Sequence, residues 1–169
     1  VSGGVEGAQL GVLSVMVGGK EIGIQRALPF LEAFASRVLH MGSVGSGQSA
    51  KAVNQILCAG INEAVTEALG LGSALGLDLE KTIEAIRYGA AGNWFLDKRG
   101  HTMTKGHFEP GFKVRLHHKD LEICLTLAEE AAFETPLTRQ TLDHYETLIS
   151  QGHGDEDISA LFRLKRVFV

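Results

Sequence analysis

The pattern of apolar and polar positions divides the chain after residue 42. Before that point, two short apolar runs at residues 13–17 and 38–41 predict β-strands. Residues 20–35, between them, carry apolar side chains at helical spacing, and Pro29 should bend or shift this helix. Residues 1–4 are predicted to end a further strand and turn into a loop. Residues 1–42 are therefore predicted to be a piece of an α/β domain.

After residue 42 every predicted element is a helix. The first runs from about Gln48 to Leu75, is apolar nearly all round and would span ~40 Å, so it should be buried on several sides. Asp78 and Asn93 are predicted caps of the next two helices. The sequence thus predicts a mostly α chain, with an all-helical domain over residues 43–169 after an α/β remnant over residues 1–42. The shorter helices are predicted over residues 79–88, 94–100, 116–133, 136–150 and 158–166.

Composition narrows the range of functions. The chain has 169 residues, a formal net charge of −4 and no long basic run, which disfavours a nucleic-acid partner. No charge-free apolar run is long enough to span a bilayer, so no membrane association is expected. Cys58 and Cys124 fall within helical patterns and are predicted to be reduced core thiols of a cytoplasmic protein, with a disulfide between them as the alternative. The chain opens on Val1, within a predicted strand end, and this start predicts a piece of a longer protein.

Candidate chemistry gathers at the start of the long helix. Lys51 and Asn54 are three residues apart and Lys51 and Gln55 are four apart, so their side chains lie on neighbouring rows of one helix face. One cation and two amides that point the same way can hold and protonate a small oxygen-rich substrate. The alternative is that Lys51 only solvates the first turn of the helix.

Residues 45–50, Gly-Ser-Gly-Gln-Ser-Ala, fit the spacing of a dinucleotide-binding loop. Such a loop must be followed by a helix, a second strand and an acidic residue roughly 20 positions on. Here the helix simply continues, so we reject the phosphate-loop interpretation. The glycines are predicted instead to make a flexible corner between two domains and to let a ligand approach the backbone.

Other polar clusters are predicted to have structural roles or, for His117 and His118, to be structural or to face solvent. His117 and His118 point ~100° apart on a helix and have no carboxylate or cysteine at ligand spacing, so no metal site is predicted. Glu63 and Glu67 lie four residues apart but too far along the helix from Lys51 to share its substrate. They are expected to serve helix packing or capping.

Four motifs together resemble a known family. Residues 1–4, Val-Ser-Gly-Gly, resemble its substrate-side loop, and Gly45-x-Gly47-x-x-x-Lys51 resembles its catalytic-lysine motif. Gly-Phe at 111–112, followed by His-Lys-Asp-Leu at 118–121, resembles the segment whose lysine lies beside the cofactor. Residues 157–161, Asp-Ile-Ser-Ala-Leu, resemble the final helix. In order and spacing the chain resembles the C-terminal part of the β-hydroxyacid dehydrogenases, which include 3-hydroxyisobutyrate dehydrogenase and tartronate semialdehyde reductase.

The resemblance implies a fold and a reaction. Residues 1–42 would be the last strands and helix of a Rossmann-type NAD(P)-binding domain, and the rest an all-helical substrate and dimerisation domain. The enzyme would be an NAD(P)-dependent oxidoreductase (EC 1.1.1.-) that transfers hydride between NAD or NADP and a small 3-hydroxy acid or its semialdehyde. Lys51 would be the general acid and base. The implied substrate-binding residues are Ser2, Gly3, Gly4, Asn54 and Gln55, and the implied cofactor-binding residues are Lys119 and Phe112.

Departures from the family pattern bear on the substrate. The family usually has asparagine four positions after the lysine, where this chain has Gln55 preceded by Asn54, a pair more similar to tartronate semialdehyde reductases. 6-Phosphogluconate dehydrogenases have histidine at the Asn54 position, and imine reductases lack the lysine, which argues against both. The family's main glycine fingerprint is not in this sequence, so the fragment alone is expected to be inactive.

A second class of function stays open at this point. Without the fingerprint, the chain would be a non-catalytic helical oligomerisation module. In either case, a long apolar helix that one small domain cannot cover predicts a homodimer or homotetramer through that helix. A four-helix cofactor bundle is not expected, because the sequence lacks the inward Glu-x-x-His pairs that it needs.

Overall fold

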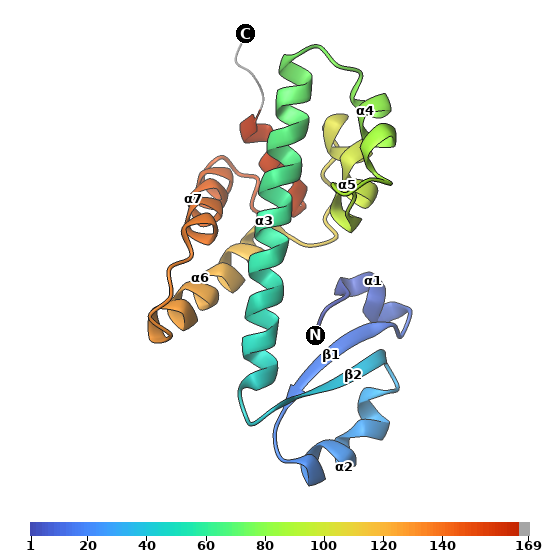
Figure 1. Cartoon of the computed structure of the whole chain (residues 1–169), viewed down its shortest axis with the longest axis vertical. Coiled ribbons are helices and arrows are strands. Elements are labelled where there is room, and N and C mark those ends of the chain that lie inside the picture. Colours follow the sequence, from blue (N-terminus) through green and yellow to red (C-terminus); the bar gives the residue numbers. More distant parts are fainter. Residues whose placement is uncertain (166–169) are drawn as a thin grey trace.

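The computed structural model describes residues 1–165 and shows a small α/β unit attached to a larger helical domain (Figure 1). The strands β1 and β2 pair in parallel, with Val15 opposite Val38, and α2 makes the crossover between them. The two predicted strands and the helix between them are confirmed. In chain order the unit consists of α1 (Gly4–Gln9), β1 (Leu13–Gly18), α2 (Glu21–Leu31) and β2 (Ala35–Gly42).

The sequence pattern predicts a loop where the structure has α1. Ser2 pairs with Ser14 of β1 through two backbone hydrogen bonds of 2.8 and 2.9 Å, as expected for a strand end. The chain then turns at Gly3 and Gly4, whose φ angles are 129° and 62°. The helix that follows has only 6 residues and no side-chain N-cap bond, so it leaves little periodicity to detect.

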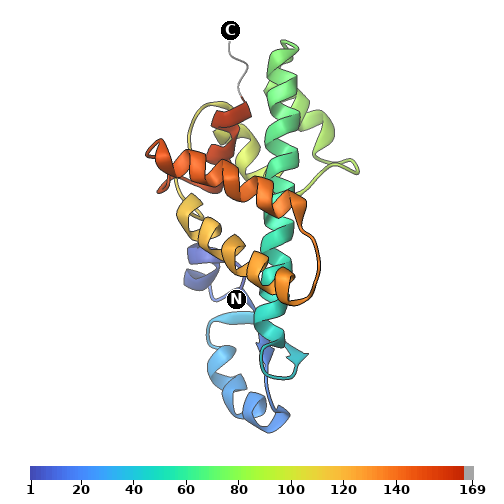
Figure 2. The same cartoon turned by 90° about the vertical axis from the view of Figure 1, so that its left-hand side faces the viewer.

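The helical domain is built around α3 (Ser46–Ala74), whose 29 residues span ~44 Å. In Figure 1, α4 and α5 lie on one side of α3 and α6 and α7 on the other, and Figure 2 shows α6 and α7 crossing it. All the predicted helices are present and the fold is mostly α, although the last one is a 3-10 helix and residue 166 lies outside the described residues. The elements around α3 are α4 (Leu79–Ile86), α5 (Trp94–Thr104), α6 (Val114–Glu130), α7 (Pro136–Ser150) and η1 (Ile158–Lys165).

Local signals set the helix ends. The Asp78 and Asn93 side chains each accept a hydrogen bond from a first-turn backbone N–H, at 3.1 and 2.9 Å, so both expected caps are confirmed. The prediction that the helix after Asn93 ends near Gly100 is wrong. Gly100 is buried inside α5, where a Cβ would lie 3.1 Å from the Ile83 side chain. It is a packing glycine rather than a stop signal.

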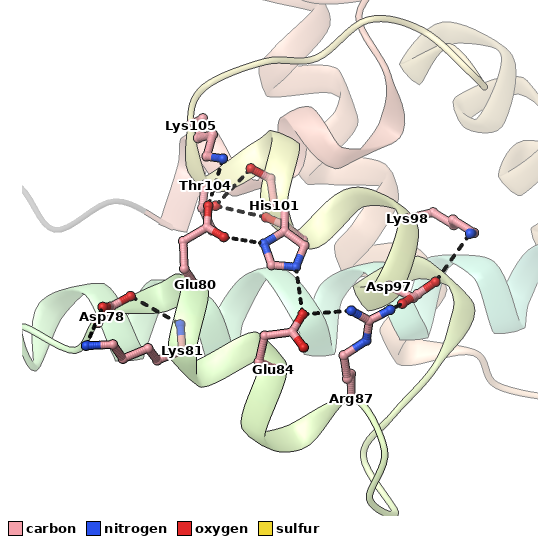
Figure 3. A network of polar contacts seen from close by, with 11 residues as sticks. Asp78, Glu80, Lys81, Glu84, Arg87, Asp97, Lys98, His101, Thr104 and Lys105 are labelled. Atoms are coloured by element: carbon pink, nitrogen blue, oxygen red, sulfur yellow. Dashed lines mark hydrogen bonds and ion pairs between the residues drawn. The ribbon is translucent and has the colours of Figure 1, made fainter.

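Charged side chains join α4 to α5 at the surface (Figure 3). His101 of α5 contacts Glu80 at 2.8 Å and Glu84 at 3.5 Å, and Lys105 pairs with Glu80 at 2.8 Å. These side chains are exposed or half-buried. The network therefore aligns two helices without burying charge.

Two apolar cores hold the molecule together. The main core fills the helical domain and includes Leu69, Leu121, Leu148 and Leu161, all almost fully buried. The smaller core, which underlies the parallel strands, is made by Leu13, Val15 and Ala35.

Glycines let α3 start tightly against β1. Gly45 turns the chain with a φ of 95°. The helix after it continues to residue 74, and no second strand follows within about 20 residues as a phosphate-binding loop would need. A Cβ on Gly47 would lie 2.4 Å from the Met16 carbonyl oxygen, and one on Gly18 would lie 2.4 Å from the Ser43 carbonyl oxygen. The expectation that a ligand approaches the backbone here is wrong at Gly47, because β1 fills the space.

Candidate active site

Lys51 lies on the second turn of α3, where the α/β unit meets the helical domain. Its side chain is half-buried, and its ammonium forms no hydrogen bond or ion pair within residues 1–165. Burial lowers the pKa of Lys51 below its ordinary value, while Cys58, Asp120 and Cys124 act in the opposite direction. An ammonium in this setting releases its proton more readily than a solvated lysine does.

The N-terminal loop approaches the same end of α3. Ser2 pairs with Ser14 of β1, and β1 packs against the start of α3 at Gly47. Gly4 lies beside Gly111, since a Cβ on Gly4 would be 3.8 Å from the Gly111 carbonyl oxygen. Because Gly3 and Gly4 have positive φ, a side chain would be strained at either position, and at Gly3 it would also meet the Leu13 side chain at 2.8 Å. The predicted substrate loop therefore lies between α3 and the segment that leads to α6.

The two amides after Lys51 form a chain that crosses to α6. Gln55 is only 3% exposed and its Nε2 donates to Asp120 Oδ2 at 2.7 Å. Asn54 Nδ2 donates to Gln55 Oε1 at 2.8 Å and lies 3.5 Å from Cys58 Sγ. Both amide atoms of Gln55 are thus engaged within the protein, whereas the half-buried Asn54 keeps its oxygen free of partners in the described part of the chain.

Asp120 is a candidate functional residue that the sequence analysis named only as part of the motif at residues 118–121. Its Oδ1 lies 2.8 Å from Lys119 Nζ, and its other oxygen holds Gln55, so it joins the predicted cofactor and substrate residues. Lys119 itself is exposed. The helical pattern contained a signal, because Asp120 lies on the same side of α6 as the buried His117 and Cys124.

A chain of buried hydrogen bonds ends at the backbone of Gln55. Asn62 Nδ2 donates to the Tyr145 hydroxyl at 3.0 Å, that hydroxyl donates to His117 Nδ1 at 3.0 Å, and His117 Nε2 donates to the Gln55 carbonyl oxygen at 3.1 Å. Burial lowers the pKa of His117 to about 4, so the imidazole is neutral at pH 7. These bonds hold α3 against α6 and α7 at Gln55, one turn beyond Lys51. His117 has the structural role that the sequence analysis expected.

His117 predicts how stability depends on pH. In the unfolded chain its pKa returns to 6.5, so the unfolded state binds a proton between pH 6.5 and about 4 that the native state does not. The free energy of unfolding should therefore fall as pH drops through this range, by ~3 kcal/mol. In urea titrations at pH 7 and pH 4.5, His117→Asn should lose less stability on acidification than the unaltered chain. Equal losses would mean that His117 is not buried neutral.

Asp157 places the segment that carries Phe112. One of its oxygens accepts hydrogen bonds from the backbone N–H groups of Gly111 and Phe112, at 2.9 and 3.1 Å, and the other accepts from the Ser159 hydroxyl at 2.7 Å. Arg99 approaches the same carboxylate at 3.3 Å. The Phe112 ring lies 5.4 Å from that of His117. The buried Asp157 thus connects the terminal motif to the predicted cofactor residue.

Other candidate sites lie apart from this cluster. A hollow of about 660 Å³ is lined by the end of α6 and the start of α7, including Phe133 and Arg139, and by none of the predicted site residues. Within residues 1–165, no group of His, Cys, Asp or Glu is arranged to hold a metal ion, and no helix is long and apolar enough to cross a membrane. Glu63 is buried between His144 and Lys165, at 2.7 and 2.8 Å, in the packing role predicted for it.

Two family models match most of the chain. One, described as the NAD-binding domain of NADP-dependent 3-hydroxyisobutyrate dehydrogenase, matches residues 45–165. The chain belongs to the β-hydroxyacid dehydrogenase family. The other, the NAD-binding domain of 6-phosphogluconate dehydrogenase, matches residues 1–42. The cofactor of these domains is NAD or NADP.

Curated relatives agree with this assignment. The chain is 39% identical over 161 residues to the 2-hydroxy-3-oxopropionate reductase of Escherichia coli K12, covering 95% of this chain and 55% of that protein. It is 33% identical to the NAD-dependent L-serine dehydrogenase of Pseudomonas aeruginosa, covering 97% of this chain and 57% of the relative. The chain thus spans a little over half the length of these relatives.

Solved structures share the fold. The 3-hydroxyisobutyrate dehydrogenase of Salmonella typhimurium superposes with a TM-score of 0.86 at 30% identity, covering 96% of this chain and 57% of that one. The enzyme of the same name from Mycobacterium tuberculosis, whose structure includes L-serine, gives 0.86 at 32% identity, covering 98% and 59%.

The residues of this site fit the nicotinamide end of NAD or NADP and not its phosphates. The groups available to a polar ring or a carboxylate are the backbone of Gly4, where an added Cβ would lie 3.8 Å from the Gly111 carbonyl oxygen, and the exposed side chain of Lys119. The space at Gly47 is filled by β1, so the start of α3 offers no glycine cradle for the phosphates.

Proposed function

We propose that this chain is the catalytic-lysine half of an NAD(P)-dependent 3-hydroxyacid dehydrogenase and acts as part of a longer polypeptide. The substrate would be a small 3-hydroxy acid or its semialdehyde, of the tartronate semialdehyde or 3-hydroxyisobutyrate type. The observation that carries the proposal is the environment of the Lys51 ammonium. It is half-buried and free of ion pairs in the described residues, on the helix that also carries Asn54 and Gln55 and close enough to Asp120 for that charge to act on its pKa. The 39% identity to a semialdehyde reductase supports it.

NAD(P) supplies and accepts the hydride, and the residues of this chain bind the substrate and move the proton. When a carbonyl is reduced, the Lys51 ammonium donates a proton to its oxygen, and in the reverse direction the neutral amine accepts it. The lowered pKa of Lys51 suits it to both roles. Burial at the junction also strengthens the interaction of the ammonium with a developing alkoxide.

The surrounding residues would position the two reactants. The Ser2 hydroxyl and the backbone N–H groups of Gly3 and Gly4 would bind the substrate carboxylate. Asn54 would contact the substrate through its remaining oxygen. Gln55 stays a predicted substrate ligand, although its burial and its bonds favour a role in holding Asn54 and Asp120. On the other side, Lys119 and Phe112 would border the nicotinamide.

Asp120 should control the pH dependence of the reaction. Its negative charge raises the pKa of Lys51, so Asp120→Asn should lower that pKa further. In the full-length enzyme, the decline of kcat/KM for carbonyl reduction at high pH should therefore begin at a lower pH. Glu122→Gln, an exposed charge change on the same helix, is the control and should leave the profile unchanged. An unchanged pH profile in the Asp120 variant would mean that the charge of Asp120 does not raise the pKa of Lys51.

A substrate panel tests the proposed activity. The full-length enzyme that carries this chain should oxidise 3-hydroxyisobutyrate, glycerate, 4-hydroxybutyrate or threonate with NAD or NADP, followed as nicotinamide absorbance. We expect turnover with 3-hydroxyisobutyrate or glycerate, the two members of the panel that have a 3-hydroxyl group on a three-carbon backbone. No turnover with either cofactor, from a folded full-length protein, would favour the alternative of a non-catalytic helical module.

The proposal includes assembly and location. We propose that the enzyme is a cytoplasmic homodimer or homotetramer, with small hydroxy acids as its other partners. Support comes from the long α3, which carries large exposed apolar side chains, and from two free cysteines that form no disulfide in the described residues.

A further inference from the structure

Three polar side chains, one on α6 and two on α3, form a chain of hydrogen bonds whose direction is set at Asp120. Asp120 Oδ2 accepts from Gln55 Nε2 at 2.7 Å, and the other oxygen of Asp120 lies 2.8 Å from Lys119 Nζ. A carboxylate has acceptors only, so Gln55 must point its NH2 group at Asp120. If the Gln55 amide were turned over, its oxygen would face a carboxylate oxygen with no proton between them.

The direction passes on from Gln55 to Asn54. Because the Gln55 nitrogen faces Asp120, the Gln55 oxygen faces Asn54 and needs a donor there. Asn54 Nδ2 donates to it at 2.8 Å, and the same nitrogen lies 3.5 Å from Cys58 Sγ, a weak acceptor. The NH2 group of Asn54 is thus engaged inside the protein, and its Oδ1 has no donor among residues 1–165. Asn54 therefore offers a ligand an acceptor and no donor.

This oxygen lies beside the proposed proton donor. Lys51 and Asn54 are three residues apart on α3, where side chains are neighbours with Cβ atoms ~5–6 Å apart. Both side chains are half-buried. When Lys51 contacts the oxygen on carbon 3 of a hydroxy acid, Asn54 Oδ1 comes within reach of the substituent on carbon 2. An acceptor that a ligand covers without donating to it costs free energy, so this position discriminates between substituents.

We propose that Asn54 Oδ1 selects 3-hydroxy acids that carry a hydrogen-bond donor, a hydroxyl or an ammonium group, on carbon 2. Asp120 is the positioning residue that imposes this choice through Gln55. The inference rests on the proposed function, because it takes Lys51 as the group that meets carbon 3. Acids such as glycerate are then preferred over acids such as 3-hydroxyisobutyrate, whose methyl group is close to a hydroxyl in size but leaves Asn54 Oδ1 without a donor.

Equilibrium binding tests the selection without catalysis. Glycerate, 3-hydroxyisobutyrate and 2-fluoro-3-hydroxypropionate, each as both enantiomers, are titrated by calorimetry into the full-length protein saturated with NADH or NADPH, which cannot accept a hydride from them. Glycerate should bind ~10–100-fold more tightly than the other two, because neither a methyl group nor fluorine donates a hydrogen bond. Asn54→Leu, which is similar in shape, should abolish this preference. Val53→Ala, an exposed change at the next position, is the matched control and should keep it.

The outcomes separate this inference from the proposed reaction. Equal affinities for glycerate and 3-hydroxyisobutyrate in the unaltered protein, binding of neither acid, or a preference that survives in Asn54→Leu would each overturn the selection. A protein that shows the preference but turns over no substrate would contradict the proposed reaction and leave the selection standing.

NMR of the 169-residue chain tests the direction of the amides. The NH2 protons of Asn54, assigned by their loss in Asn54→Leu, should show nuclear Overhauser contacts with the Cβ protons of Cys58. Asp120→Asn should weaken these contacts, because an amide at position 120 both donates and accepts and no longer fixes the direction of Gln55. Glu122→Gln, an exposed change on the same helix, should leave them unchanged. Contacts that are absent from the unaltered chain, or that persist at full strength in Asp120→Asn, would show that Asp120 does not set the direction.

Discussion

Lys51→Ala should reduce kcat of the full-length enzyme by ~10²–10⁴ while the affinity for the nicotinamide cofactor stays near that of the unaltered protein. The reason is that Lys51 is the proton donor in the proposed reaction, and its ammonium is not tied to any other group in the described residues. Steady-state kinetics give kcat, and fluorescence titration gives the cofactor affinity.

Two controls make this result specific. Lys98→Ala removes an exposed lysine that only pairs with Asp97, and should leave kcat unchanged. Lys51→Arg keeps the positive charge but not a transferable proton, so it should be nearly as slow as Lys51→Ala. Turnover close to normal in the alanine variant would remove Lys51 from the mechanism.

Asp157→Ala should be the most destabilising single change at the site, costing about 3–5 kcal/mol in the free energy of unfolding. The carboxylate is buried and holds two backbone N–H groups, a serine hydroxyl and the Arg99 guanidinium, which would lose their acceptor together. Urea unfolding of the chain, followed by circular dichroism, measures this cost. Because Asp157 anchors Phe112, the full-length variant should also bind its cofactor more weakly.

Asp155→Ala provides the matched comparison. This neighbouring carboxylate is exposed and pairs with Lys113 and Arg115 at the surface, so its loss should change stability little. Asp157→Asn keeps an acceptor for the backbone N–H groups and should fall between the two. If Asp157→Ala unfolded at the same urea concentration as Asp155→Ala, the carboxylate would not be the anchor of this segment.

Local signals in the sequence were enough to predict most of the helical architecture. The extent of α3 follows from a long apolar pattern, and the starts of α4 and α5 follow from the caps at Asp78 and Asn93, because a capping bond joins residues only a few positions apart. The face shared by Lys51, Asn54 and Gln55 follows in the same way from helical geometry. These features depend on neighbours in the chain, which the sequence displays directly.

The remaining features depend on distant partners. Gly100 resembled a helix end, but Ile83 of another helix makes it a packing position. The role of Asp120 depends on its hydrogen bond with Gln55, which lies 65 positions away in the chain. Asp157 lies 46 positions from the backbone that it holds. No local pattern reports such contacts, so the family motifs indicated Asp120 and Asp157 without giving their physical roles.

The titration of the Lys51 ammonium tests the central claim most directly. Lysine side chains of the 169-residue chain can be labelled with ¹³C-methyl groups and followed by NMR as pH rises, with Lys51→Arg to assign the Lys51 signal. The account predicts a pKa for Lys51 below the ordinary value of 10.5, because the side chain is half-buried without an ion-pair partner in the described residues. A pKa at or above 10.5 would show a solvated or paired ammonium and contradict the proposed role.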